Sequence, residues 1–397
     1  MTTLFLVVVL DLIGFGMIIP VFPFYAERVG VAPAAVILFL GLYSLGQLVG
    51  APIWGAMSDR YGRRPILLAT LLANTAANLV LAVSHDPVSL ALSRVVSGLA
   101  AGNISAAYAY VTDITDDAQR PKALGLLGAA FGIGFILGPA FGALLAGGDT
   151  DGTSGLARVS YGAAAFSMLG FVLTLLRLPE SHPPEARKAK RAARTGLGAY
   201  LRRPVLGELM LSAVVVVAAV AMMQSTLALW TASALEVTPA TLGWIYGFVG
   251  VVSTVVQAGL TGPLVRRFGA ATLLRAGTAL AGVGMILIPF STSVPLLLLW
   301  LGIFGVGSAI TNPAYSQLVA SVAAPSERGA VLGAFQGAAS LGRVIGPFAA
   351  SGVAAVSTLR WPFLVGGALG LVGLFLQRHV AQPAPTSAPA EPRPEAA

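Results

Sequence analysis

Three charged residues lie deep inside long apolar stretches of the 397-residue chain, where a charge is costly. Asp11 is in the first stretch, Arg94 in the fourth and Arg343 in the eleventh. A carboxylate that meets two different solvents in turn can bind a proton from one and release it to the other, because desolvation favours its neutral form. We therefore predict that Asp11 and Arg94 take part in proton coupling. The alternative is that Asp11 is a structural acid, bonded to the backbone or to an arginine.

The other polar and aromatic groups in these stretches are mostly neutral, and they could line a cavity. A weakly charged cavity of amides and aromatics favours an amphipathic organic substrate over a small ion or a phosphate ester. Alternatively, each of these residues could form a hydrogen bond between helices or be an aromatic residue of the core. Arg343 could instead stabilise the packing between the two halves of the chain. The predicted cavity set is Gln47, Asn74, Asn78, Asn103, Gln224, Trp230, Tyr246, Gln257, Asn312, Tyr315, Gln336 and Arg343.

The composition of the chain indicates that these residues are carried by helices that span a membrane. The chain is 56% hydrophobic and only 10% charged, whereas a soluble domain carries about 25% charge. A spanning helix needs about 20 mostly apolar residues. We expect an all-α integral membrane protein, embedded in a lipid bilayer, with twelve transmembrane helices near residues 4–24, 34–57, 66–84, 88–111, 122–146, 158–177, 205–231, 239–264, 270–290, 294–318, 329–353 and 361–378.

Basic residues set the expected orientation. If the first span starts in the cytoplasm, nineteen of the 24 Lys and Arg residues face the cytoplasm and three face outside. Positive residues favour the cytoplasmic side, so we expect both termini there, in a cell (inner) membrane. The same charges are spread between apolar stretches and form no compact basic patch, so we expect no nucleic-acid partner.

Several kinds of chemistry lack the residues they need. The chain has no cysteine, and its three histidines fall at span ends or in loops. We find no paired carboxylates, nucleophile triad, Walker loop or metal-ligand spacing. We therefore expect no enzyme activity, no metal and no cofactor, and a gradient as the source of energy for transport.

The chain contains an internal repeat of about 207 residues. Gly55–Gly62 recurs as Gly262–Gly269, and the Gly138-Pro139 pair recurs as Gly346-Pro347. Two parallel halves that rock about a site at mid-membrane have this organisation. The predicted parts are a first half at 1–177, a basic cytoplasmic linker at 178–204, a second half at 205–380, and a disordered tail at 381–397. In the linker, residues 185–194 favour a basic amphipathic helix.

The segment after the second span, residues 55–65, predicts a tight cytoplasmic turn. Its glycines allow close approach or positive φ, and its arginines keep it inside. The segment resembles the motif A loop of major facilitator transporters, Gly-x-x-x-Asp-Arg-x-Gly-Arg-Arg. By that resemblance the loop aspartate caps a helix of the other half, and an arginine pairs with an acid at the end of span four. The conformational latch it implies consists of Gly55, Asp59, Arg60, Gly62, Arg63, Arg64 and Asp113, whereas Arg266 replaces the aspartate in the second repeat.

Span five carries glycines at a spacing that suits close helix packing, together with an internal proline. The stretch resembles motif C, Gly-x-x-x-x-x-Gly-Pro-x-x-Gly, which occurs mainly in proton-coupled exporters. The resemblance implies an antiporter, and simple packing is the alternative. The residues concerned are Gly132, Gly134, Gly138, Pro139 and Gly142.

Over nearly its whole length the chain resembles the tetracycline-efflux branch of the drug:proton antiporters, through Asp11–Pro20, Pro179–His182 and Leu260–Pro263. This implies a monomeric exporter of small drug-like molecules or metabolites in exchange for protons, of the kind that confers multidrug or antibiotic resistance. Arg94 matches the arginine of motif B, which the family is thought to use in proton movement. The embedded aspartates of tetracycline exporters correspond to Ala77 and Ala281 here, so the substrate stays open. A uniporter or importer of a sugar or organic anion is the alternative.

Overall fold

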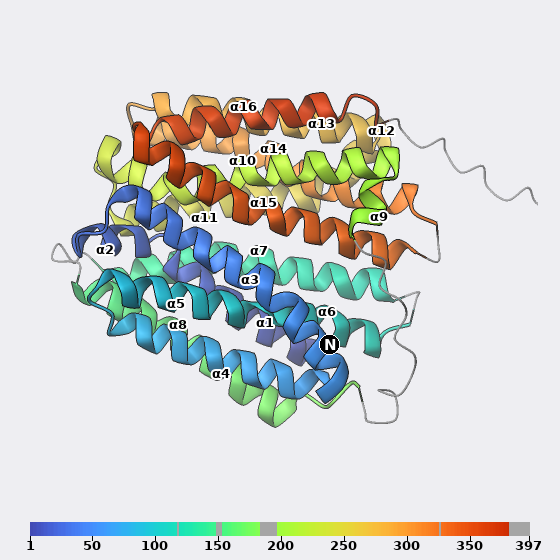
Figure 1. Ribbon diagram of the computed structural model, residues 1–397, viewed down its shortest axis with the longest axis horizontal. Helices are drawn as coiled ribbons and strands as arrows, with labels where there is room; N and C mark the ends of the chain where they lie inside the picture. Colours follow the sequence, from blue (N-terminus) through green and yellow to red (C-terminus); the bar gives the residue numbers. More distant parts are fainter. Residues whose placement is uncertain (117–118, 148–152, 183–196, 325–326, 381–397) are drawn as a thin grey trace, which may run out of the picture.

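The computed structural model describes residues 1–116, 119–147, 153–182, 197–324 and 327–380, and these segments are helical with short connections (Figure 1). The first half contains α1 (Thr2–Ile18), α2 (Phe22–Arg28), α3 (Pro33–Tyr61), α4 (Arg63–Ala82), α5 (Pro87–Ala100), η1 (Ala101–Asn103), α6 (Ile104–Ile114), α7 (Arg120–Ala146) and α8 (Thr153–Arg177). The second half contains α9 (Leu197–Leu201), α10 (Pro204–Leu235), α11 (Pro239–Val255), η3 (Val256–Leu260), α12 (Thr261–Phe268), α13 (Ala270–Leu287), η4 (Ile288–Phe290), α14 (Val294–Val322), α15 (Arg328–Val356) and α16 (Trp361–Leu376).

The helices fit the predicted membrane architecture. In the described segments, eleven helical stretches are long and apolar enough to cross a bilayer, and α16 adds a shorter apolar helix of 16 residues. Some predicted spans combine two elements, since α1 continues into α2 and α5 continues through η1 into α6. The chain is therefore an all-α membrane protein of two six-helix halves. The predicted amphipathic segment 185–194 and the tail 381–397 lie outside the described residues.

Local signals explain where several helices begin. The side chain of Asp86 accepts hydrogen bonds from the backbone of Val88 and Ser89 at 2.9 and 3.0 Å, so it caps α5. Pro87 takes the first helical position, where a missing N–H costs nothing.

The predicted turn at 55–65 is much shorter than expected. Helix α3 runs on to Tyr61 and α4 starts at Arg63, so Gly62 alone separates them. Gly62 has φ 106°, a backbone conformation that side-chain-bearing residues rarely adopt. The residues of this loop are therefore mostly helical, which fixes the directions of their side chains.

In each half, the helix with the repeated Gly-Pro pair packs with its backbone against the first helix of that half. In the first half α7 packs on α1, and a Cβ built on Gly138 would lie 2.7 Å from the Cα of Gly16. In the second half α15 packs on α10, where a Cβ on Gly342 would lie 2.6 Å from the Val214 carbonyl oxygen. Small residues permit this close approach in membrane helices. The sequence repeat is thus also a repeat of packing.

The two halves meet along α3 with α15 and along α7 with α11. We call the end with the first residue of α1 and the last of α16 the terminal end. Away from that end the halves touch closely: Ser351 Oγ donates to the Ala34 carbonyl at 2.8 Å, and a Cβ on Gly41 would lie 3.0 Å from Phe348. Near the terminal end of α15, a Cβ on Gly333 or Gly337 would meet no described atom within 4 Å. The halves are therefore in close contact away from the terminal end, whereas α15 has few neighbours near the terminal end.

Candidate functional site

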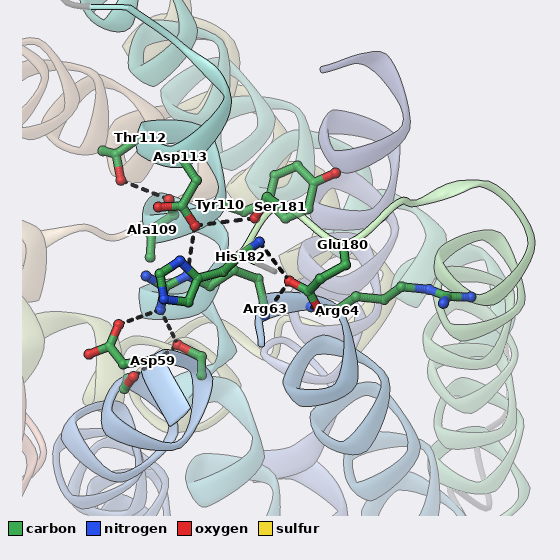
Figure 2. A network of polar contacts seen from close by, with 12 residues as sticks. Asp59, Arg63, Arg64, Ala109, Tyr110, Thr112, Asp113, Glu180, Ser181 and His182 are labelled. Atoms are coloured by element: carbon green, nitrogen blue, oxygen red, sulfur yellow. Dashed lines mark hydrogen bonds and ion pairs between the residues drawn. The ribbon is translucent and has the colours of Figure 1, made fainter. Parts of the chain in front are cut away.

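Arg63, the first residue of α4, is the centre of a polar network at the terminal end (Figure 2). Its Nε donates to Asp113 Oδ2 at 2.9 Å, and its Nη1 donates to Asp59 Oδ1 at 2.6 Å and to Ser58 Oγ at 2.7 Å. The residue is 6% exposed, so its charge is stabilised mainly by these partners. The structure thus brings together the ends of α3, α4 and α6 through the three residues that the sequence singled out.

Glu180 and Ser181, just after α8, complete this network, although sequence reasoning gave them no role. Glu180 accepts hydrogen bonds from the backbone N–H groups of Arg63 at 2.8 Å and Arg64 at 3.3 Å. Helix N-termini leave such donors unsatisfied and favour a negative charge. Ser181 Oγ donates to Asp113 Oδ2 at 3.2 Å. Figure 2 shows Glu180 at the start of α4 and Ser181 beside Asp113 of α6. The Pro179–His182 resemblance was the available signal.

The remaining predicted latch residues lie around this centre. Arg64 Nη2 donates to the Leu175 carbonyl at 2.7 Å, which ties α4 to the end of α8. Arg60 is exposed and lies over the Tyr61 ring. Gly55 is inside α3, where a Cβ would come 3.7 Å from Ser105 Oγ.

The second repeat has a different arrangement at the same end of the molecule. Arg266 occupies the place of Asp59 in the repeat. There, Arg275 Nη2 donates to the Val380 carbonyl at 2.8 Å and to the Gln377 carbonyl at 3.2 Å. Gln377 in turn donates from Nε2 to the Tyr315 hydroxyl at 2.9 Å. Main-chain carbonyls after α16, rather than carboxylates, accept the hydrogen bonds of Arg275.

Asp11 lies within α1 and is bound by two neutral amides. Asn74 Nδ2, from α4, donates to Asp11 Oδ1 at 3.0 Å, and Asn103 Nδ2, from η1, donates to Oδ2 at 3.0 Å. Asn74 also donates to Ser167 Oγ of α8 at 3.2 Å. The short 3-10 turn at Ala101–Asn103 interrupts the fourth span and places the second amide. Of the two structural partners expected for Asp11, backbone or arginine, neither is found among the described residues.

Arg94 lies on α5 and is buried, with 3% exposure. Its guanidinium carbon sits 5.1 Å from the centre of the Phe22 ring, a cation–π geometry. Its Nε and Nη2 atoms have no hydrogen-bond partner within the described part of the chain. Arg94 therefore does not pair with Asp11 in this conformation.

Arg343, in contrast, is exposed near the middle of α15. Its Nη2 donates to Ser340 Oγ at 2.8 Å. The guanidinium lies within electrostatic range of the hydroxyls of Tyr43 and Tyr108, which belong to the other half. Asp11 and Arg94 also act on Tyr43.

Other predicted cavity residues divide by exposure. Gln47 and Tyr246 are half-buried, whereas Asn78 is buried. Trp230 and Tyr315 are each 2% exposed: the first packs edge-on against Phe363, and the second binds Ser212 and Gln377. Placing these two aromatics on the cavity surface was wrong, because they fill the core of the second half. The exposed members are Gln224, Gln257, Asn312 and Gln336.

The glycines of the motif C stretch mostly face a neighbouring helix. Gly134, Gly138 and Gly142 all abut α1, where any added Cβ would collide with Leu12, Gly16 or Met17. Gly132 is looser, with Thr254 Oγ1 of the other half 3.7 Å from a Cβ. Pro139 is inside α7, and its carbonyl oxygen would lie 2.7 Å from a Cβ on Gly243 of α11. The stretch therefore joins packing within a half to contact between halves.

Two further placements bear on the chemistry. Ala77 and Ala281 are buried at 2% and 4% exposure, so both positions are filled by packing. Within the described segments, no group of three or more His, Cys, Asp or Glu side chains could hold a metal.

Comparisons with known proteins agree with this architecture. The family model of the Major Facilitator Superfamily matches residues 4–257 and 209–397. The class C tetracycline resistance protein of Escherichia coli is 30% identical, covering 96% of each chain. Major facilitator superfamily domain-containing protein 10 of Mus musculus is 28% identical, covering 97% of this chain and 93% of its own. Among solved structures, the human organic anion transporter MFSD10 has a TM-score of 0.69 at 23% identity over 95% and 98% of the two chains. The nucleoside transporter NupG (D323A mutant) has a TM-score of 0.79 at 14% sequence identity. The match covers 96% of this chain and 99% of that chain.

Proposed function

Because the chain belongs to the major facilitator superfamily, whose members are transporters rather than enzymes, we propose that it is a proton-coupled exporter of amphipathic drug-like or metabolite molecules. Transport of a small molecule across a membrane follows from the family. Proton exchange, export and substrate class are the proposed parts. The similarity to a tetracycline resistance protein favours efflux.

The observation that carries the proton-coupling proposal is the environment of Asp11. Its two carboxylate oxygens each accept from one neutral amide, Asn74 or Asn103, at 3.0 Å. A nearby cation would hold a carboxylate ionised, but protonation of Asp11 does not have to break an ion pair. The side chain is also only partly buried. A carboxyl group in this setting can change its protonation state when its exposure to solvent changes.

The test is transport by the purified chain in liposomes, with and without a pH gradient, for a panel of amphipathic compounds that includes a tetracycline. We expect the gradient to accelerate export of at least one compound, and Asp11→Asn to remove the acceleration. Asp86→Asn is the matched control, because it makes the same change at an exposed helix cap where Asn serves equally well. A gradient without effect on any transported compound would reject the antiporter.

The second candidate is a uniporter or importer of a sugar or organic anion. The exposed Arg343 guanidinium favours it, as does the similarity to an organic anion transporter. A uniporter predicts transport down the substrate's own gradient at a rate that does not depend on the pH difference. A proton-coupled importer predicts that the pH gradient drives the substrate in the same direction as the protons. The liposome experiment above therefore separates the two.

The proposed orientation has both termini in the cytoplasm of an inner membrane, with the protein acting as a monomer of halves 1–177 and 205–380 joined by the linker 178–204. It rests on the basic loops of the terminal end. In that orientation the contact between Ser351 and Ala34 lies toward the outer side. Because the chain has no cysteine, Arg202→Cys provides a single label site, and in intact cells it should resist an impermeant maleimide.

A further inference from the structure

The charges deep in the membrane do not balance. Asp11 is the one carboxylate of the three, and amides bind it. Arg94 contacts the Phe22 ring, and Arg343 binds Ser340. Among the described residues neither arginine has a carboxylate within salt-bridge distance. Even with Asp11 ionised, the interior therefore carries an excess positive charge, which is costly inside a bilayer unless something compensates it.

The positive charge of Arg343 lies where an anionic molecule from solution could neutralise it. One turn further along α15, Pro347 and Phe348 pack against Gly41, where the halves are in contact. On the terminal side of Arg343, the helix surface at Gly337 and Gly333 is clear of described atoms for 4 Å. The guanidinium thus lies near the middle of α15, about one turn from the contact between the halves.

The surroundings of Arg343 suit an anionic group. Tyr43 and Tyr108 of the opposite half lie within electrostatic range and carry hydroxyls that can donate to an anion. Tyr108 is 40% exposed. An arginine fork binds carboxylates more strongly than neutral acceptors.

We propose that Arg343 binds the acidic group of the substrate, and that the substrate class is amphipathic organic acids. This inference rests on the proposed transport of small molecules through the space between the halves, but not on proton coupling. When the halves close around a site, water leaves it, and a cation left without a partner is strongly disfavoured. A bound acid supplies that partner. Arg343 thereby disfavours closure around neutral or cationic compounds of the same shape.

The test uses three probes that share one ring and differ in charge: indole-3-acetate, indole-3-acetamide and tryptamine. Equilibrium binding of each is measured on the full chain in nanodiscs at pH 7.5, without any gradient. We expect indole-3-acetate to bind about tenfold or more tightly than the other two, as for hydrogen bonds to charged groups. Arg343→Gln should remove that preference by weakening the acetate about tenfold and leaving the acetamide nearly unchanged.

Two controls make the result specific. Arg343→Lys keeps the charge without the fork and should retain part of the preference. Arg202→Gln removes the same charge from an exposed position outside the spans and should change nothing. The monodispersity and melting temperature of each variant show that it is folded.

Three results would overturn the proposal: equal affinities for the three probes in the wild type, an anion preference that survives in Arg343→Gln, or no measurable binding of indole-3-acetate. If Arg343 instead only holds the halves together, Arg343→Gln should lower the melting temperature while weakening all three probes equally. Binding here is measured at equilibrium, so failure of gradient-driven transport would leave this result standing.

Discussion

Arg63 Nε donates to Asp113 Oδ2 over 2.9 Å, and this bond joins the first residue of α4 to the last turn of α6. The Arg63 side chain is 8% exposed and that of Asp113 is 19% exposed. Asp113→Asn removes the negative partner of a charge that stays buried, so we expect it to destabilise the protein by about 1–3 kcal/mol. A double-mutant cycle with Arg63→Gln, read from thermal melting in detergent, measures the coupling. Additive effects of the two changes would contradict a direct interaction.

Glu180 accepts from the Arg63 and Arg64 backbone at the start of α4. Replacing Glu180 with Ala should leave those two N–H groups without a cap and weaken the first turn by about 1 kcal/mol. Hydrogen exchange at the amides of Arg63 and Arg64 should then accelerate about fivefold or more. Ser181→Ala is the control, because Ser181 binds Asp113 and not the helix N-terminus. Unchanged protection in the Glu180 variant would rule out the cap.

Gly138 faces Gly16 across the α1–α7 contact, where an added Cβ would lie 2.7 Å from the Gly16 Cα. Gly138→Ala should push the helices apart and destabilise the protein by about 1–3 kcal/mol. Gly125→Ala makes the same change on the same helix where no described atom lies within 4 Å, so it should be neutral or slightly stabilising. The two melting temperatures give the comparison, and equal values would show that the contact is not tight.

Ser351 and Ala34 connect the halves away from the terminal end through a 2.8 Å hydrogen bond. In this cysteine-free chain, Ala34→Cys with Ser351→Cys should form a disulfide on oxidation, since the Ser351 side chain reaches the backbone of residue 34. The bridge should stop transport, and reduction should restore it. Single cysteines give the control: Gly337→Cys should react with a soluble maleimide, whereas Ala350→Cys, fully buried, should be protected. Oxidised protein with normal transport would contradict movement at this contact.

Glu327 and Arg203 form an exposed pair at the starts of α15 and α10, with Nη2 and Oε2 3.0 Å apart. Hydrogen bonds from Arg203 hold the pKa of Glu327 below its usual value. The pair therefore stabilises the fold above that usual pKa, and its contribution is lost as the pH falls through the lowered value. The melting temperature of Glu327→Gln should be below that of the wild type at neutral pH, and the difference should vanish in acid. Arg203→Gln should match it, while Arg202→Gln should not.

The fold could be predicted from the sequence because its main signals are local or repeated. Long apolar stretches set the spans, and the recurrence of Gly138-Pro139 as Gly346-Pro347 set the two halves. The structure places both proline pairs inside helices that pack on their first-span partners. The 55–65 segment was misjudged in length, because one glycine at positive φ does what a longer turn was expected to do.

The site was harder to predict because its partners are distant in sequence. Asp11 binds Asn74 and Asn103, 63 and 92 residues away, and an amide in an apolar stretch does not reveal its partner. Trp230 and Tyr315 were placed in the cavity because an aromatic in an apolar helix has the same sequence signature whether it faces a core or an opening. Only the packing around them distinguishes the two cases.

Helices α7 and α15 each use two opposite faces. One face of α7 presses its backbone on α1 at Gly138, and the other meets α11 where Pro139 adjoins Gly243. Contact between backbones leaves no side-chain rotamers to absorb a displacement. When α1 tilts, α7 therefore tilts with it, and the displacement reaches the boundary with the opposite half. The glycine-packed helix pairs make each half move as a rigid body, so the motion of the transport cycle occurs at the boundary between the halves.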